Sequence, residues 1–126
     1  ASDVYKRQEI TGRPLKKRTK IFINGYALGI TNRSLELLLQ FAVALKQAGK
    51  GWVHKEDFAS NVGATQLVSR LRSELRDHTI SRDGKIIEND GSGRYRLSVP
   101  PDNVIVEKES LSGHWSAVVR ELVQEV

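Results

Sequence analysis

Residues 32–47 carry an apolar pattern so wide that any fold of this chain must be built around them. Thr31 or Asn32 can cap a helix here and Gly49 can end it, since both ends of a helix favour such residues. A helix that is apolar over much of its circumference has to be covered from several sides. We therefore expect it at the centre of the molecule. The apolar positions at helical spacing are Leu35, Leu38, Leu39, Ala42 and Leu45.

A β-hairpin is expected before the central helix, over residues 20–30. The dipeptide Asn24-Gly25 separates two short apolar runs, and it favours a tight turn because both residues tolerate positive φ. After the central helix, residues 51–53 favour a short strand. Residues 55–61 favour a short helix that buries Phe58.

A second amphipathic helix is predicted over residues 64–77, with apolar side chains on one face and polar and basic side chains on the other. The short strands expected after it are 79–81, 85–88 and 94–99, with turns at 83–84 and 90–93. The apolar stripe of the helix is Leu67, Val68, Leu71 and Leu75. The residues expected to share one core are Leu38, Leu39, Phe58, Leu67, Leu71, Leu75 and Trp52.

The N-terminal segment, residues 1–19, is polar and basic and predicts a flexible arm that precedes a folded domain over residues 20–101. Within the arm, Ser2–Gln8 resembles a translated sequencing-adapter scar, so we exclude it from the fold prediction.

The C-terminal segment, residues 102–126, predicts an added amphipathic helix that Ser110 or Ser112 can cap. The helix, at 112–125, packs either within the chain or against a protein partner or a second copy. The segment is acidic, which argues against DNA contact by this end of the chain. The residues expected on its apolar face are Trp115, Val118, Val119 and Leu122.

Composition narrows the classes of function. The chain has 126 residues, of which 39% are hydrophobic, enough for one domain with a core. It has no cysteine and no apolar run of membrane-spanning length, so we expect a cytoplasmic protein without membrane contact. The histidines lack metal-ligand spacing, and no nucleophile accompanies the acidic pairs. We therefore expect neither an enzyme nor a bound metal or cofactor.

The formal net charge of +5 is concentrated at the N-terminus, where residues 1–20 hold seven lysines and arginines against two acidic residues. The rest of the chain is neutral overall, so charge alone is weak evidence for a nucleic-acid partner. The functional inference depends on the local pattern of the helix at 64–77.

Two short helices joined by a turn that contains Gly63 are typical of a helix-turn-helix motif. In that motif the second helix enters the major groove of DNA, where glutamine can pair with adenine and arginine with guanine. Small serines allow the backbone to approach. The residues predicted to read bases are Gln66, Ser69, Ser73 and Arg76.

Basic side chains around this face predict phosphate contacts. A rotation of about 100° per helical residue puts Arg70 and Arg72 at the edges of the face, towards the groove walls. The residues predicted to bind phosphate are Arg70, Arg72, Arg94, Arg96, Lys16, Lys17 and Arg18. Arginines on a helix are also common as solvated surface, and that alternative stays open.

The chain resembles the OmpR/PhoB-type winged-helix effector domain of bacterial transcription regulators over residues 20–99. The resemblance rests on VSRLRSEL at 68–75, GRYRL at 93–97 and GWVHKEDF at 51–58. Two features depart from the family. Arg94 separates the wing glycine from its tyrosine, and the loop between the last two helices, which often touches RNA polymerase in the family, is nearly absent.

The resemblance implies an α+β fold: a winged helix-turn-helix with an N-terminal β-hairpin, a three-helix core, a C-terminal wing hairpin and an added C-terminal helix. It also implies that the helix at 64–77 is the recognition helix and that residues 90–93 are the wing tip. The expected function is sequence-specific binding of double-stranded DNA in transcription regulation. The alternative is a winged-helix protein-interaction module within a larger assembly.

Overall fold

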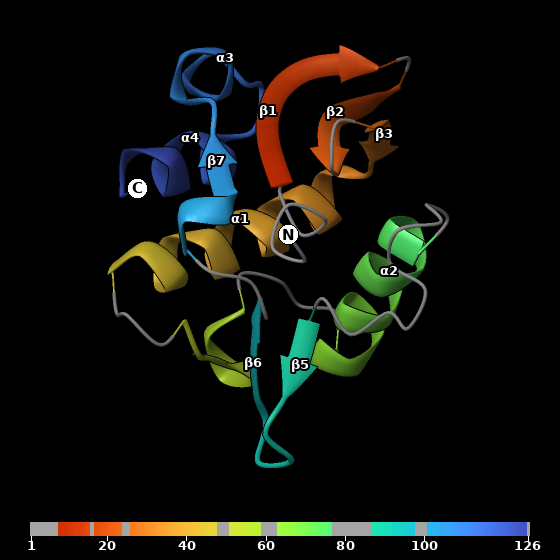
Figure 1. The fold of residues 1–126 in the computed structure, drawn as a ribbon, viewed down its shortest axis with the longest axis vertical. Helices are drawn as coiled ribbons and strands as arrows, with labels where there is room; N and C mark the ends of the chain where they lie inside the picture. Colours follow the sequence, from red (N-terminus) through yellow and green to blue (C-terminus); the bar gives the residue numbers. More distant parts are fainter. Residues whose placement is uncertain are drawn as a thin grey trace.

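The computed structural model of the protein describes residues 8–15, 17–23, 26–47, 51–58, 63–76, 87–97 and 101–125. Over these residues it contains four α-helices and two β-sheets, which confirms the α+β class (Figure 1). One sheet is mixed and has four strands, and the other is antiparallel and has three.

The central helix is α1 (Asn32–Gln47). Its first hydrogen bond joins the amide of Leu35 to the carbonyl of Thr31 over 2.9 Å, so the helix begins where the capping residues predicted. Gly49 lies outside the described residues. The four-stranded sheet lies above α1 and the three-stranded sheet below it in Figure 1. Because α1 is covered from both sides and buries most of its side chains, the expectation of a central helix is confirmed.

The larger sheet has the strand order β3-β2-β1-β7. β2 (Arg18–Ile23) and β3 (Tyr26–Ile30) form the predicted hairpin, with Ile23 paired to Tyr26. The Asn24-Gly25 turn itself lies outside the described residues. The pairing on both sides of the turn nevertheless confirms the hairpin.

The segment expected to be a flexible arm is a strand where the structure describes it. β1 (Gln8–Leu15) runs antiparallel to β2 and parallel to β7 (Val104–Val106). Ile10 is fully buried, and the hydroxyl of Thr11 donates a 2.6 Å hydrogen bond to the carbonyl of Lys20. A strand between two neighbours is held by backbone hydrogen bonds that almost any sequence can make. The polar composition of this segment therefore concealed the strand.

Gly12 in β1 permits a close approach of two backbones and is not a flexible joint. Its amide donates a 2.9 Å hydrogen bond to Oγ of Ser110 in α3 (Lys108–Ser112). A Cβ atom at Gly12 would lie only 2.5 Å from the carbonyl oxygen of Ser110. The glycine that suggested a flexible arm thus allows α3 to pack against β1.

The smaller sheet has the order β4-β6-β5 and contains the predicted C-terminal hairpin. β5 (Ile87–Asn89) and β6 (Arg94–Leu97) pair antiparallel, and β4 (Val53–His54) lies on the other side of β6. The strand expected at 79–81 lies outside the described residues. The hairpin and the short strand before it are confirmed.

The short helix expected at 55–61 is a single 3₁₀ turn, η2 (Lys55–Asp57), in the part that the structure describes. Phe58 follows in extended conformation, with φ −68° and ψ 130°, and it is buried as predicted. Its ring lies 5.8 Å from Phe41 and 5.7 Å from Tyr95, measured between centroids. The packing of Phe58 against these two rings outweighs the local helical preference of the segment.

The helix expected at 112–125 is shorter than predicted, because residues 113–116 are not helical. A 3₁₀ turn, η3 (Pro101–Asn103), leads into β7 and then into α3, and α4 (Ala117–Gln124) follows after a short joint. Ser116 caps α4 by accepting a 3.5 Å hydrogen bond from the amide of Val119. α4 packs against α1, so the C-terminal segment belongs to the same body as the rest of the described chain. Trp115, expected on the apolar face, lies in the joint and is 75% exposed.

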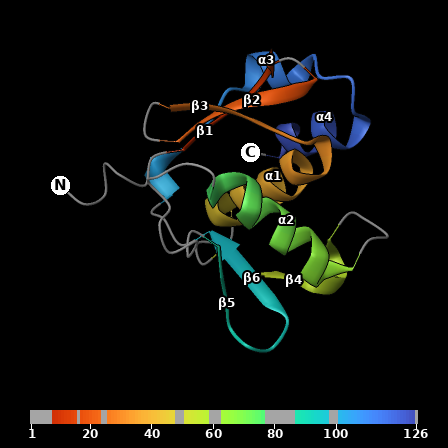
Figure 2. The same cartoon turned by 90° about the vertical axis from the view of Figure 1, so that its right-hand side faces the viewer.

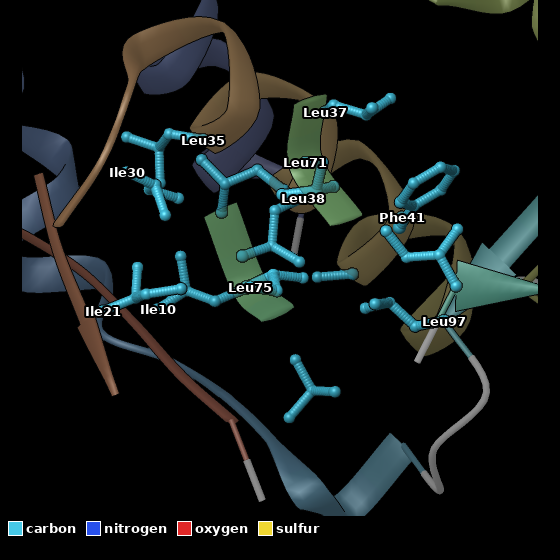
Figure 3. Packing of buried hydrophobic residues seen from close by; sticks show 14 of the residues in the cluster. Ile10, Ile21, Ile30, Leu35, Leu37, Leu38, Phe41, Leu71, Leu75 and Leu97 are labelled. Carbon is cyan, nitrogen blue, oxygen red and sulfur yellow. The ribbon is translucent and has the colours of Figure 1, made fainter. Parts of the chain in front are cut away.

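The hydrophobic core is one cluster that joins the helices and both sheets, and Figure 3 shows Leu71 and Leu75 of α2 (Ala64–Arg76) beside Leu38 of α1. Trp52 does not belong to it. The Trp52 ring is partly buried and lies under the guanidinium of Arg96, whose central carbon is 4.4 Å from the ring centroid. The predicted core residues that are confirmed are Leu38, Leu39, Phe58, Leu67, Leu71 and Leu75.

Candidate nucleic-acid interface

The register of α2 agrees with the sequence prediction. The apolar stripe is buried, and the side chains that point away from it are exposed. α2 crosses the front of the molecule in Figure 2, between β1–β3 above and the β5–β6 hairpin below, and Figure 1 shows the same order. The exposed side chains of α2 are Thr65, Gln66, Ser69, Arg70 and Ser73.

These side chains line one open groove of about 1290 Å³. The other wall of the groove is built by Arg18 at the start of β2, by Thr31 and by Arg33 in the first turn of α1. Three of the four predicted base-reading residues are thus brought together: Gln66, Ser69 and Ser73. Arg76 ends α2, and its side chain lies outside the described part of the chain.

Arg33 and Glu74 are the charged groove residues that the sequence did not predict. Arg33 stands in the capping segment of α1, and only the folded chain brings it opposite α2. Glu74 accepts hydrogen bonds from the amide of Thr31, over 2.7 Å, and from the hydroxyl of Ser34. Its carboxylate also lies 3.8 Å from Nη1 of Arg18. Glu74 therefore fastens α2 to the N-terminus of α1, where the helix dipole favours an anion.

Two of the predicted phosphate-binding arginines are directed at protein atoms. Nη2 of Arg72 donates a 2.7 Å hydrogen bond to the carbonyl of Ile87 in β5. Arg96 pairs with Glu88 across the hairpin and covers the ring of Trp52. These guanidinium groups support the smaller sheet, and phosphate binding by Arg72 and Arg96 stays a prediction.

Arg94 is exposed at the base of an ordered turn. The carboxylate of Asp90 accepts hydrogen bonds from the amides of Ser92, over 2.7 Å, and Arg94, over 3.2 Å. The pKa of Asp90 is lowered, first by the hydrogen bond from Ser92 and further by Arg94. Gly91 and Gly93 have φ of 81° and 88°, a conformation that glycine adopts without strain. The turn therefore presents Arg94 from a defined backbone.

The N-terminal cations divide into two groups. Lys16 lies outside the described residues, whereas Lys17 is exposed in the turn between β1 and β2. Arg18 donates a 3.4 Å hydrogen bond to the carbonyl of Gly29 and reaches the α2 groove. The paired strands β1 and β2, and not a flexible arm, position Lys17 and Arg18.

Over the described ranges, no helix has the length and apolar character needed to cross a membrane. The same residues contain no group of three or more histidine, aspartate or glutamate side chains arranged to hold a metal ion.

Comparison with known proteins finds no matching family model, no matching curated protein and no matching solved structure.

Proposed function

We propose that this protein is a winged helix-turn-helix module that binds double-stranded DNA through α2. The observation that carries the proposal is the exposed face of α2, which gathers Gln66, Ser69 and Ser73 over one open groove with Arg18 and Arg70. The resemblance of the sequence to OmpR/PhoB-type effector domains supports it, since the equivalent helix is the recognition helix of that family.

The chemistry of this face suits the major groove. A groove about 12 Å wide admits one α-helix, and base edges present hydrogen-bond donors and acceptors to it. Gln66 can make two hydrogen bonds with adenine, and the short side chains of Ser69 and Ser73 let the helix backbone come close. Arg76, at the end of α2, is proposed for a guanine. The proposed mechanism is therefore binding with base readout, in the service of transcription regulation.

Phosphate contacts are proposed on both sides of α2. Arg70 lines the groove from α2 and Arg18 lines it from the opposite wall. Arg94 is exposed at the base of the β5–β6 turn, and this hairpin lies below α2 in Figure 2. Such contacts set the position and orientation of a protein on the duplex, whereas base contacts set its preference. The β5–β6 hairpin takes the role of a wing in this arrangement.

The test is binding to a random-sequence duplex between 50 and 200 mM salt, the range over which phosphate contacts weaken strongly. We expect the logarithm of the association constant to fall linearly with the logarithm of the salt concentration. The slope should become shallower by about 0.9 in Arg70→Ala, and by about the same amount in Arg94→Ala. Lys46→Ala, on the exposed last turn of α1, is the matched control and should leave the slope unchanged. No binding at the lowest salt would contradict the proposal and favour the protein-interaction module.

A further inference from the structure

A second hollow, of about 420 Å³, adjoins the α2 groove. It lies between the β1–β2 turn, the N-terminus of α1 and the joint between α3 and α4. We call it the Trp115 hollow. The residues that characterise it are Pro14, Lys17, Arg18, Asn32, His114 and Trp115.

Trp115 is exposed, and its indole ring packs against a buried neighbour. Its indole ring is stacked on the imidazole of His114, with centroids 5.3 Å apart and planes inclined by 28°. His114 is itself buried and fixed, since its Nδ1 accepts a 3.0 Å hydrogen bond from the amide of Ser116 and its Nε2 lies 3.3 Å from Oγ1 of Thr19. An exposed aromatic side chain that is already ordered loses little entropy when it binds a partner.

The charge of the Trp115 hollow points to an anionic partner. Lys17 and Arg18 line it, and no carboxylate belongs to its described lining. Arg18 lines the α2 groove as well. The first residues of α1 lie between the two depressions, with Asn32 in the hollow and Thr31 in the groove. A DNA backbone that extends beyond the segment bound by α2 would therefore reach the hollow next.

We propose that the Trp115 hollow binds the sugar-phosphate backbone of the DNA that flanks the segment under α2, an inference that rests on the proposed function. Lys17 neutralises a phosphate, and the indole of Trp115 packs against deoxyribose while its N–H donates to a phosphate oxygen. The C-terminal segment was expected to avoid DNA because it is acidic. Its joint at 113–116 carries no acidic residue, however, and lies against the cationic β1–β2 turn.

The experiment compares duplexes of about 10 and about 20 base pairs, one and two helical turns. Lys17→Ala and Trp115→Ala should bind the short duplex like the wild type and the long duplex at least about fivefold more weakly. The salt slope on the long duplex should fall by about 0.9 in Lys17→Ala and stay unchanged in Trp115→Ala, because only lysine displaces a counterion. Variant and wild type are compared on the same duplex, since a longer duplex also offers more binding registers.

Two matched controls separate this surface from general effects. Lys46→Ala removes an exposed lysine from the other end of α1, and Ile105→Ala removes an exposed apolar side chain from β7. For both control variants, the affinity relative to the wild type should be the same on the short and the long duplex. In a Trp52→Phe background, where Trp115 is the only tryptophan, the long duplex should protect its fluorescence from acrylamide quenching and the short duplex should not.

The outcomes distinguish this inference from the proposed function. If both variants bind the long duplex like the wild type, or Trp115 is not protected, the inference is wrong while α2-directed binding to the short duplex stands. Equal loss on both duplexes also overturns it, because the hollow would then lie under the segment that α2 reads. If the wild type binds neither duplex, the proposed function and this inference fail together.

Discussion

At the scale of single residues, Glu74 determines how α2 is presented. Its side chain is 11% exposed, and its carboxylate accepts hydrogen bonds from Thr31 and Ser34 at the start of α1. These groups lose an anionic acceptor if the charge is removed. Glu74 thus fixes the distance between α2 and the N-terminus of α1 across which the groove opens.

Glu74→Gln should lower the free energy of unfolding by about 1–3 kcal/mol, the range for a lost charged hydrogen bond that leaves a partner unsatisfied. The amide keeps the shape of the side chain but turns a donor towards the donors of α1. Urea unfolding measures the change. Glu109→Gln, on the exposed face of α3, is the matched control and should stay within about 0.5 kcal/mol of the wild type. Equal stability of the two variants would mean that Glu74 does not fasten α2.

At the scale of elements, the sequence predicts those helices and strands that are specified by residues close together in the chain. α1, α2 and the β2–β3 hairpin are specified by nearby residues, through a 3.6-residue period and a turn dipeptide, and all three were predicted. β1 depends on its parallel pairing with β7, which no local pattern encodes. The exposed face of α2 was predicted for the same local reason. The place of Arg33 opposite α2 arises only from tertiary packing, as do the contacts of Arg72 with β5 and of Arg96 with Trp52.

Gly12→Ala tests whether β1 is an integral strand. A Cβ atom at this position would lie 2.5 Å from the backbone oxygen of Ser110, which cannot move without displacing α3. We expect the free energy of unfolding to fall by about 1–3 kcal/mol, as for other overpacking substitutions.

Chemical unfolding measures this change as well. The matched control is Gly63→Ala, where an added Cβ atom meets nothing within 4 Å. A Gly12→Ala protein as stable as that control would show that the N-terminal segment is a loose arm after all.

At the scale of the whole molecule, His114 connects the N-terminal sheet to the C-terminal helices. It faces Thr19 of β2 on one side and Ser116 before α4 on the other. Nδ1 accepts a hydrogen bond, so the ring is neutral in the folded protein. Burial lowers the pKa of His114, and the nearby cation Arg120 lowers it further.

The lowered pKa predicts a loss of stability in acid. The unfolded chain takes up a proton on His114 near pH 6.5, whereas the folded protein resists protonation until lower pH. The stabilising contribution is therefore complete above pH 6.5 and is lost as the pH falls through the lowered pKa. Unfolding free energies measured between pH 5 and 8 should show this decline, and it should be smaller in His114→Gln. The same decline in both proteins would contradict the assignment.

The central claim is that α2 reads base edges while the β5–β6 hairpin binds the backbone. Selection from random duplexes with the wild type, Gln66→Ala and Arg94→Ala tests it most directly. We predict that the wild type enriches a defined sequence and that Gln66→Ala loses preference at one base position, with a cost of about 1–3 kcal/mol on the preferred site. Arg94→Ala should keep the same preference and bind every duplex more weakly. No enrichment by the wild type, or a preference altered by Arg94→Ala and not by Gln66→Ala, would contradict the account.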